Sequence, residues 1–166
     1  MTKQPEVIDK SAWGDGPWNA EPDRAEWEHA GLPCLAIRHP RTGHWCGYAA
    51  VPPGHPAHGH GYDTPNVDVH GGLTYAKGCT GDVCHVPKLG EPDDVWWFGF
   101  DCANGGDFSP YENTRPRRYP WSTTAYSHER AMAAVDDWSV EKYRTLDYVR
   151  EETNRLAEQL AKESAA

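Results

Sequence analysis

The chain has 166 residues, a net charge of −9 at pH 7 and 38% hydrophobic residues, with eight Trp and eight Tyr. A chain of this length is most simply a single domain that is long enough to bury a core. Residues 60–112 contain nine Asp or Glu and only two Lys. Nucleic acid is therefore not an expected partner, because binding a phosphate backbone requires a basic surface. The acidity fits either an ordinary surface or one that meets cations or a basic partner.

The first ten residues contain no long apolar run, and no later stretch approaches the length of a transmembrane helix. We therefore expect neither a signal peptide nor a membrane span, and we predict a cytoplasmic protein. In that compartment most of the five Cys would be reduced. Each is then either a buried, inert thiol or a candidate for metal binding or catalysis.

Residues 1–30 are polar and rich in turn-forming residues, yet they contain Trp13, Trp18 and Trp27. So many aromatic side chains are not typical of a disordered tail. The pattern predicts an N-terminal arm that packs its tryptophans onto a single α+β domain formed by residues 31–166.

Four stretches of the chain have the pattern of β-strands. Residues 32–38 and 44–51 are separated by a short loop that contains glycine, which predicts a β-hairpin. Residues 67–70 alternate apolar and polar side chains, and residues 73–75 continue the strand after a glycine pair that permits a bulge. Residues 95–102 form a continuous apolar and aromatic run, as expected of a central strand.

Two helices are predicted after the strands, a short one over residues 127–135 and a long one over residues 139–162 that begins with Ser139 as its N-cap. The long segment has an apolar stripe with the spacing of a helix face. The stripe consists of Trp138, Lys142, Leu146, Val149, Thr153, Leu156 and Leu160. Together the elements predict an α+β fold, in which a long C-terminal amphipathic helix packs on an antiparallel β-sheet.

His70 is the first candidate for catalysis, because it ends an alternating run and is followed by Gly71 and Gly72. A His can act as a general base near neutral pH, and glycines allow backbone N–H groups to approach an anion. We therefore predict that Gly71, Gly72 and Thr74 bind a ligand beside His70. Alternatively, His70 is a core residue that is hydrogen-bonded to a carbonyl group.

Asp101 and Cys102 end the predicted central strand, where functional side chains often lie. A buried Asp needs a partner, and His70 could supply it. With Cys102 as nucleophile, the three residues would have the chemistry of a cysteine hydrolase. Neighbouring strand residues point to opposite faces, however, so we prefer a site of His70, Asp101 and Asp107 with Cys102 nearby. In a simpler interpretation, Asp107 caps the segment that follows its turn.

A zinc or other transition-metal site is a further hypothesis, because six of the nine His lie within residues 39–70. Imidazole nitrogen and thiolate sulfur are the usual zinc ligands. His58 and His60 would project to the same side of an extended segment, and Cys84 and His85 could converge in a turn. Alternatively, His55, His58 and His60 are solvated residues of a loop that is rich in Gly and Pro.

Several phrases of the sequence resemble a family of small proteins from tailed bacteriophages and prophages, notably those of actinobacteria. The resemblance covers residues 32–160. It is carried by HGGLTY at 70–75 and WWFGFDCA at 96–103, with residues 44–48, 51–56, 84–87 and 143–150. It implies a viral origin, and hence the cytoplasm of the host cell, but no particular activity. Asn104 stands where the family phrase continues with His, which weakens a metal site that depends on that His.

Two functions of such an accessory protein remain open. The first is a small hydrolase-like enzyme, in which His70 is base or metal ligand and Asp101 orients it. The second is a non-enzymatic protein that binds a host or defence-system protein, or sequesters a small-molecule ligand, through its acidic face. A third interpretation treats the same phrases as core and turn signatures only. The substrate, the partner and the oligomeric state do not follow from the sequence.

Overall fold

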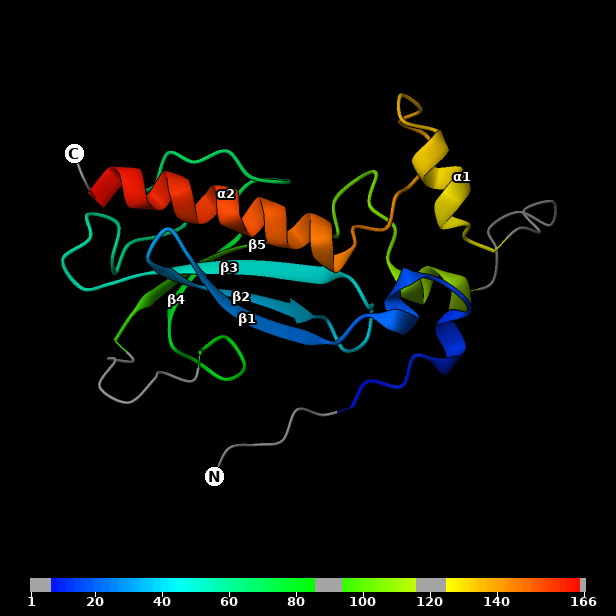
Figure 1. Cartoon of the computed structure of the whole chain (residues 1–166), viewed down its shortest axis with the longest axis horizontal. Coiled ribbons are helices and arrows are strands. Elements are labelled where there is room, and N and C mark those ends of the chain that lie inside the picture. The colour runs from blue at the N-terminus through cyan, green and yellow to red at the C-terminus, as the bar shows by residue number, and fades with distance from the viewer. Residues whose placement is uncertain (1–6, 86–93, 116–124, 165–166) are drawn as a thin grey trace.

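The structure is a computed structural model that describes residues 7–85, 94–115 and 125–164. Its centre is a five-stranded antiparallel sheet with the strand order β1-β2-β3-β5-β4 (Figure 1). The strands are β1 Arg24–His29, β2 Leu32–Arg38, β3 Trp45–Val51, β4 Tyr75–Gly78 and β5 Trp96–Asp101. The helices are α1 His128–Ala133 and α2 Leu146–Ser164, with the 3₁₀ turns η1 Ser11–Trp13, η2 Pro17–Ala20 and η3 Pro110–Thr114.

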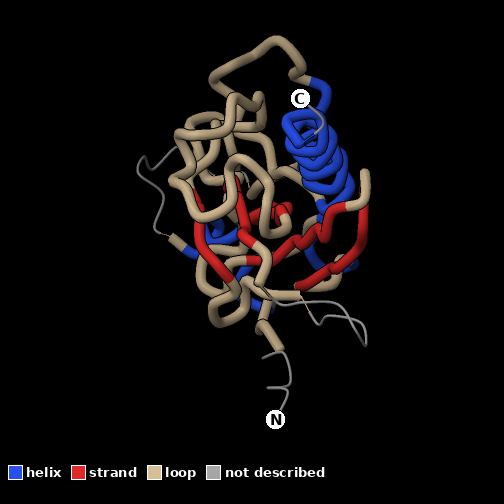
Figure 2. Tube along the Cα trace, turned by 90° about the vertical axis from the view of Figure 1, so that its left-hand side faces the viewer, coloured by secondary structure: helices blue, strands red, loops and turns tan. Residues whose placement is uncertain are grey.

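The long helix α2 lies along one face of the twisted sheet (Figures 1 and 2). It comes close to β3 at Gly47, where a Cβ atom would lie 2.5 Å from Oγ1 of Thr153. Glycine at this position therefore allows the helix and the strand to approach each other. The predicted α+β class is confirmed at this level, as an antiparallel sheet with one long C-terminal helix.

The sheet contributes to a separate apolar cluster on each of its faces. The cluster on the side of α2 includes Phe100 of β5 and Leu156 of the helix. The cluster on the other face includes Trp97, also of β5, together with Leu35 and Tyr48. Both clusters draw on the same strand because successive side chains of a strand point to opposite faces. Functional groups on β5 are therefore divided between two environments.

The long helix begins at Leu146, and the predicted start at Ser139 is wrong. The backbone of Lys142 pairs instead with residues 106–108, through one hydrogen bond to Gly106 O and one from Phe108 N. Trp138 is 93% exposed and does not belong to the apolar stripe. Lys142 is only partly buried, and the five residues of the predicted stripe that lie in the helix are buried, namely Leu146, Val149, Thr153, Leu156 and Leu160.

Two features of the sheet differ from the prediction. The segment that was expected to form an arm contributes the edge strand β1 to the sheet, although its Trp13 and Trp18 are buried, as in an arm that packs its tryptophans. Residues 67–70 are not a strand, since β4 begins only at Tyr75. The interruption coincides with Gly71 and Gly72, which adopt φ values of +67° and +79° that no continuous strand can have.

Candidate functional site

His70 makes contacts through both of its ring nitrogens. Nε2 lies 2.7 Å from Oδ2 of Asp107, and Nδ1 lies 2.7 Å from the hydroxyl of Tyr148. The guanidinium of Arg144 donates from Nε to the other carboxylate oxygen of Asp107 at 2.9 Å. Since Arg144 lies two residues before α2 and Tyr148 lies in its first turn, these contacts fix two loops to the beginning of the helix.

The Asp107 carboxylate is buried, with a side chain that is only 1% exposed. Burial by itself raises the pKa of this carboxyl, but the hydrogen bonds from His70 and Arg144 outweigh it, so that the pKa lies below its usual value. The backbone N–H of Asn104 donates to Oδ2 at 3.0 Å as well. Asp107 is therefore an ionised group whose buried charge is compensated by donors and by a neighbouring cation.

In this arrangement His70 is better suited to hold the side chains of Asp107 and Tyr148 in position than to act as a general base. A general base needs a ring nitrogen within reach of the substrate's proton. Here Asp107 occupies one nitrogen and the Tyr148 hydroxyl the other, whichever tautomer is present. The side chain of His70 is also only 13% exposed.

The glycine pair after His70 shapes the backbone rather than leaving both N–H groups open to a ligand. A Cβ atom on Gly71 would lie 2.3 Å from Nδ2 of Asn104, and this amide donates to the carbonyl oxygen of Asp101 at 2.9 Å. The N–H of Gly72 already donates to the carbonyl oxygen of Val69 at 3.0 Å. Of the two predicted ligand-binding glycines, Gly71 therefore allows the Asn104 side chain to lie close to the backbone, and Gly72 forms a turn.

Asp101 and Cys102 point to opposite faces of the sheet, as strand alternation predicts. Cys102 belongs to the buried cluster beneath α2, and its burial raises the pKa of the thiol far above the ordinary value. A thiol in such surroundings is inert as a nucleophile. The carboxylate that pairs with His70 is Asp107, so the structure does not assemble the cysteine-hydrolase set of His70, Asp101 and Cys102.

Asp101 lines a cleft on the face of the sheet that lies opposite α2. The cleft has a volume of about 430 Å³ and is lined by His44, Cys46, Tyr48, Thr74, Tyr75, Phe100, Asp101 and Ala103. Asp101 of β5 lies directly across from Cys46 of β3. Its two carboxylate oxygens accept hydrogen bonds from the Thr74 hydroxyl and the backbone N–H of Ala103, each at 3.1 Å. The predicted ligand-binding residue Thr74 thus orients Asp101 and not His70.

The neighbours of Asp101 in the cleft are neutral near pH 7. Burial raises the pKa of the Cys46 thiol to about 12, and burial likewise raises the pKa of Tyr48. Burial lowers the pKa of His44 to about 4, and the nearby His39 adds to this effect. In the described part of the chain no Lys or Arg forms an ion pair with Asp101. Its carboxylate is therefore the one formal charge among the lining residues.

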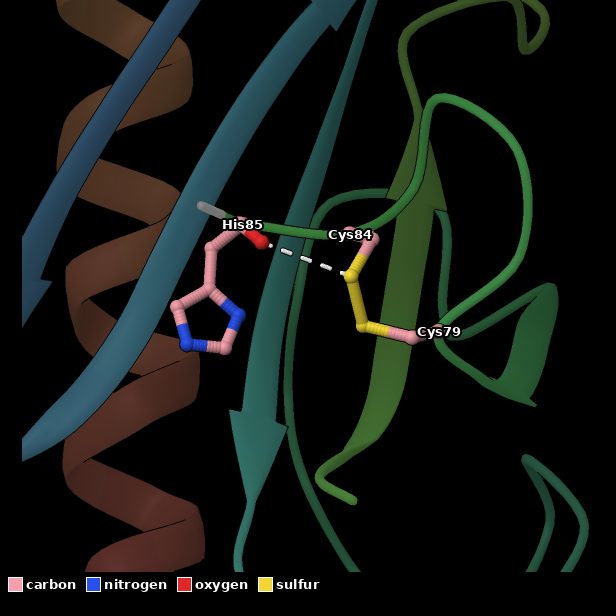
Figure 3. A group of neighbouring side chains, drawn as sticks. All are labelled: Cys79, Cys84 and His85. Carbon is pink, nitrogen blue, oxygen red and sulfur yellow. Dashed lines mark hydrogen bonds between the residues drawn. A yellow bond between two sulfur atoms is a disulfide. The ribbon is translucent and has the colours of Figure 1, made fainter. Parts of the chain in front are cut away.

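Cys79 and Cys84 form a disulfide, and His85 lies beside it (Figure 3). The expectation of mostly reduced cysteines is therefore wrong for this pair, while the other three cysteines are free. The two sulfur atoms and a ring nitrogen of His85 lie within 4.8 Å of one another. Among the described residues, this is the group of Cys and His side chains that could hold a metal ion.

The two loop histidines of the predicted metal set lie outside that group. Nε2 of His58 is 2.7 Å from the carbonyl oxygen of Asp94. The side chain of His60 is exposed, and its carbonyl oxygen accepts a hydrogen bond from Trp96 Nε1 at 2.9 Å. Within the described ranges, the structure therefore separates His58 and His60 from Cys84 and His85.

Several residues of these sites were not predicted as such. Arg144 and Tyr148 are four positions apart, a spacing that would have placed them on one side of a helix. His44, Cys46 and Tyr48 alternate along one strand, which could have indicated a common face. That this face meets Asp101 follows only from the pairing of β3 with β5.

The chain matches no protein-family model, no curated protein and no solved structure. In the described part of the molecule, no helix combines the length and the apolar character needed to span a bilayer. Function therefore has to be inferred from the geometry of the His70 network, the Asp101 cleft and the disulfide.

Proposed function

We propose that this protein is a non-enzymatic accessory protein that binds a Lys or Arg side chain of a partner protein in the Asp101 cleft. The observation that carries the proposal is the charge of the cleft, where the Asp101 carboxylate has neutral neighbours and no basic partner among the described residues. A carboxylate in such surroundings favours a cationic ligand, because its charge is not yet compensated.

Aromatic rings beside Asp101 support a cationic ligand. Tyr48 and Tyr75 meet edge to face in the cleft, with their ring centroids 5.2 Å apart. The face of an aromatic ring attracts ammonium and guanidinium groups, and the Nζ atom of Lys77 already lies 5.8 Å from the centroid of the Tyr75 ring. The net charge of −9 adds a long-range attraction for a basic partner.

The hydrogen bonding of Asp101 leaves room for such a ligand. Each carboxylate oxygen accepts one hydrogen bond within the protein, from Thr74 and from Ala103. An ionised carboxylate has about four acceptor positions, so both oxygens can still accept from a guanidinium. Because Thr74 and Ala103 already orient the carboxylate, binding costs little side-chain entropy.

The resemblance to small phage proteins makes a protein of the host cell, such as a component of a defence system, the expected partner in the host cytoplasm. A small basic molecule is the alternative ligand for the same cleft. In this proposal α2 acts as an amphipathic helix packed on the sheet, and its buried residues Val149, Leu156 and Leu160 support that arrangement. The helix then serves as scaffold and leaves the opposite face to the ligand.

Calorimetric titration of the full-length protein with a tetra-arginine peptide tests the proposal, with free arginine as the small-molecule probe. Asp101→Asn should weaken binding of the peptide at least about tenfold, since losing one partner of a partly buried charge pair costs about 2 kcal/mol or more. Asp68→Asn removes the same charge from an exposed position and should leave the affinity unchanged. Equal weakening by both variants, or no binding by the wild-type protein, would contradict the proposal.

A hydrolase-like function at His70 is the second candidate. The contact between His70 and the buried Asp107 favours it, because a carboxylate in this position orients the imidazole in many hydrolases. The Tyr148 hydroxyl would have to move away from Nδ1 when a substrate binds. Hydrolysis of p-nitrophenyl esters by the wild-type protein, lost in a folded His70→Ala variant, would support this candidate. Absent or unchanged hydrolysis would remove it.

A further inference from the structure

We propose that Cys79, Cys84 and His85 form a redox-controlled zinc site, separate from the Asp101 cleft. In the oxidised protein the disulfide between Cys79 and Cys84 closes the site. In the reduced protein the two thiolates and one imidazole nitrogen bind zinc, and a water molecule completes the four-coordinate shell.

The positions of the three ligand atoms support this site. Figure 3 shows a ring nitrogen of His85 turned towards the two sulfur atoms, and the three ligand atoms lie within 4.8 Å of one another. Ligand atoms of a tetrahedral zinc site that has zinc–sulfur and zinc–nitrogen bonds lie about 3.5–3.8 Å apart. Once the disulfide opens, rotation of the side chains is enough to reach this spacing.

A second observation concerns His85 alone. Its Nδ1 atom is buried and has no hydrogen-bond partner among the described residues. A buried ring nitrogen without a partner costs free energy. Binding a metal through this atom would remove the cost. The ring is held beside Trp97, with the two centroids 5.6 Å apart.

The loop that carries the ligands has other attachments besides the disulfide. Arg24 of β1 donates to the carbonyl oxygens of Asp82 and Cys84, each at 2.6 Å. Thr80 and Val83 exchange two backbone hydrogen bonds within the loop. We therefore expect reduction to open the disulfide while the loop stays in place, which keeps the ligands together.

The chemical steps balance with a dithiol as reductant. One reductant thiolate attacks a sulfur of the disulfide and forms a mixed disulfide, releasing one cysteine. The second reductant thiolate then releases the other cysteine, and the reductant leaves as its own disulfide. When zinc binds, the two cysteine thiols lose their protons to solvent, and neutral His85 donates its lone pair.

Cobalt titration of the full-length protein tests the proposal, because Co²⁺ bound by thiolates absorbs in the near ultraviolet through charge transfer. The protein is reduced with dithiothreitol, freed of the reductant without oxygen, and titrated beside the oxidised protein. The reduced protein should bind one Co²⁺ per chain with this absorption and release it to Zn²⁺, and the oxidised protein should not. No thiolate absorption in the reduced protein, or equal binding in both forms, would overturn the proposal.

Variants assign the ligands, with folding checked by circular dichroism. Cys84→Ser and His85→Gln should each lose stoichiometric binding, whereas His60→Gln should retain it because His60 is exposed and outside the group. His85→Gln keeps both cysteines of the disulfide, so its cobalt binding tests the site even if Cys84→Ser does not fold. An unchanged cobalt spectrum in His85→Gln would overturn the site, and so would loss of binding in His60→Gln.

Discussion

The side chain of Glu21 caps the long helix from a point 125 residues earlier in the chain, through a hydrogen bond from the backbone N–H of Leu146 to Oε2. Its other oxygen accepts from the Tyr143 hydroxyl and lies 3.2 Å from the guanidinium of Arg38. A carboxylate at this end of a helix satisfies a backbone donor and also interacts favourably with the helix dipole. The N-terminal segment thus supplies a cap for the beginning of α2.

We predict that Glu21→Ala lowers the free energy of unfolding by at least about 1–2 kcal/mol, the cost of removing a helix cap, because the buried Arg38 also loses one of its carboxylate partners. Urea denaturation followed by circular dichroism measures the change. Glu28→Gln, on an exposed position of β1, is the matched control and should leave the midpoint unchanged. The same midpoint for Glu21→Ala and wild-type protein would show that the contact contributes nothing.

The two glycines after His70 should respond differently to alanine. Both have positive φ, but a Cβ atom would collide with Asn104 only at Gly71, since nothing lies within 4 Å at Gly72. We expect Gly72→Ala to cost about 1 kcal/mol for the backbone strain alone, and Gly71→Ala to cost more. Asn104→Ala should recover part of the loss in Gly71→Ala and none of it in Gly72→Ala. Equal costs at the two positions in thermal denaturation would contradict the close approach.

The buried His44 should make stability depend on pH. Its pKa is lowered from 6.5 to about 4, chiefly by burial, so the unfolded chain binds a proton at a higher pH than the folded chain does. The contribution of neutral His44 to the free energy of unfolding is fully present above pH 6.5 and is lost as the pH falls towards 4. Between pH 7 and pH 5 the free energy of unfolding should fall by about 2 kcal/mol for this reason. His44→Asn should flatten this part of the profile, as measured by urea denaturation across the range. A wild-type profile that is already flat there would be inconsistent with the burial of His44.

Asp107 should make stability depend on pH in a lower range than His44 does. Hydrogen bonds from His70 and Arg144 outweigh the effect of burial and hold the pKa of Asp107 below its usual value of 3.8. A carboxyl with a depressed pKa stabilises the fold above its usual pKa and ceases to do so as the pH falls through the folded value. Asp107→Asn should therefore lower stability at pH 7 by about 3 kcal/mol, the cost of removing one partner from a buried charge network. The variant should also lose less stability than wild type on acidification. Asp68→Asn, which removes an exposed carboxylate, should change neither the stability at pH 7 nor its loss on acidification.

Local patterns in the sequence were sufficient to predict the bounds of the three central strands of the sheet. The strand β2 has the predicted bounds, and β3 and β5 differ from them by only a residue or so at each end. Alternation also placed Asp101 and Cys102 on opposite faces correctly. The start of α2 was wrong because its cap, Glu21, is remote in sequence, and a pattern of apolar residues contains no information about such a contact.

The candidate sites were harder to predict because each depends on contacts between distant segments. His70 and Asp107 were both named in advance, but their partners Arg144 and Tyr148 come from the region of the misplaced helix start. A disulfide between Cys79 and Cys84 was not expected, because most cysteines are reduced in the predicted compartment, and the spacing of five residues does not distinguish a disulfide from two thiols.

The contacts of Arg24 have a consequence for aggregation. Arg24 lies on β1, one edge of the sheet, and the loop that it holds at Asp82 and Cys84 follows β4, the opposite edge. Exposed edge strands invite pairing with other chains, and proteins commonly protect them with charged side chains or covering loops. Here one guanidinium ties one edge strand to the loop that leaves the other. A change that releases this loop should therefore favour intermolecular strand pairing before it unfolds the sheet.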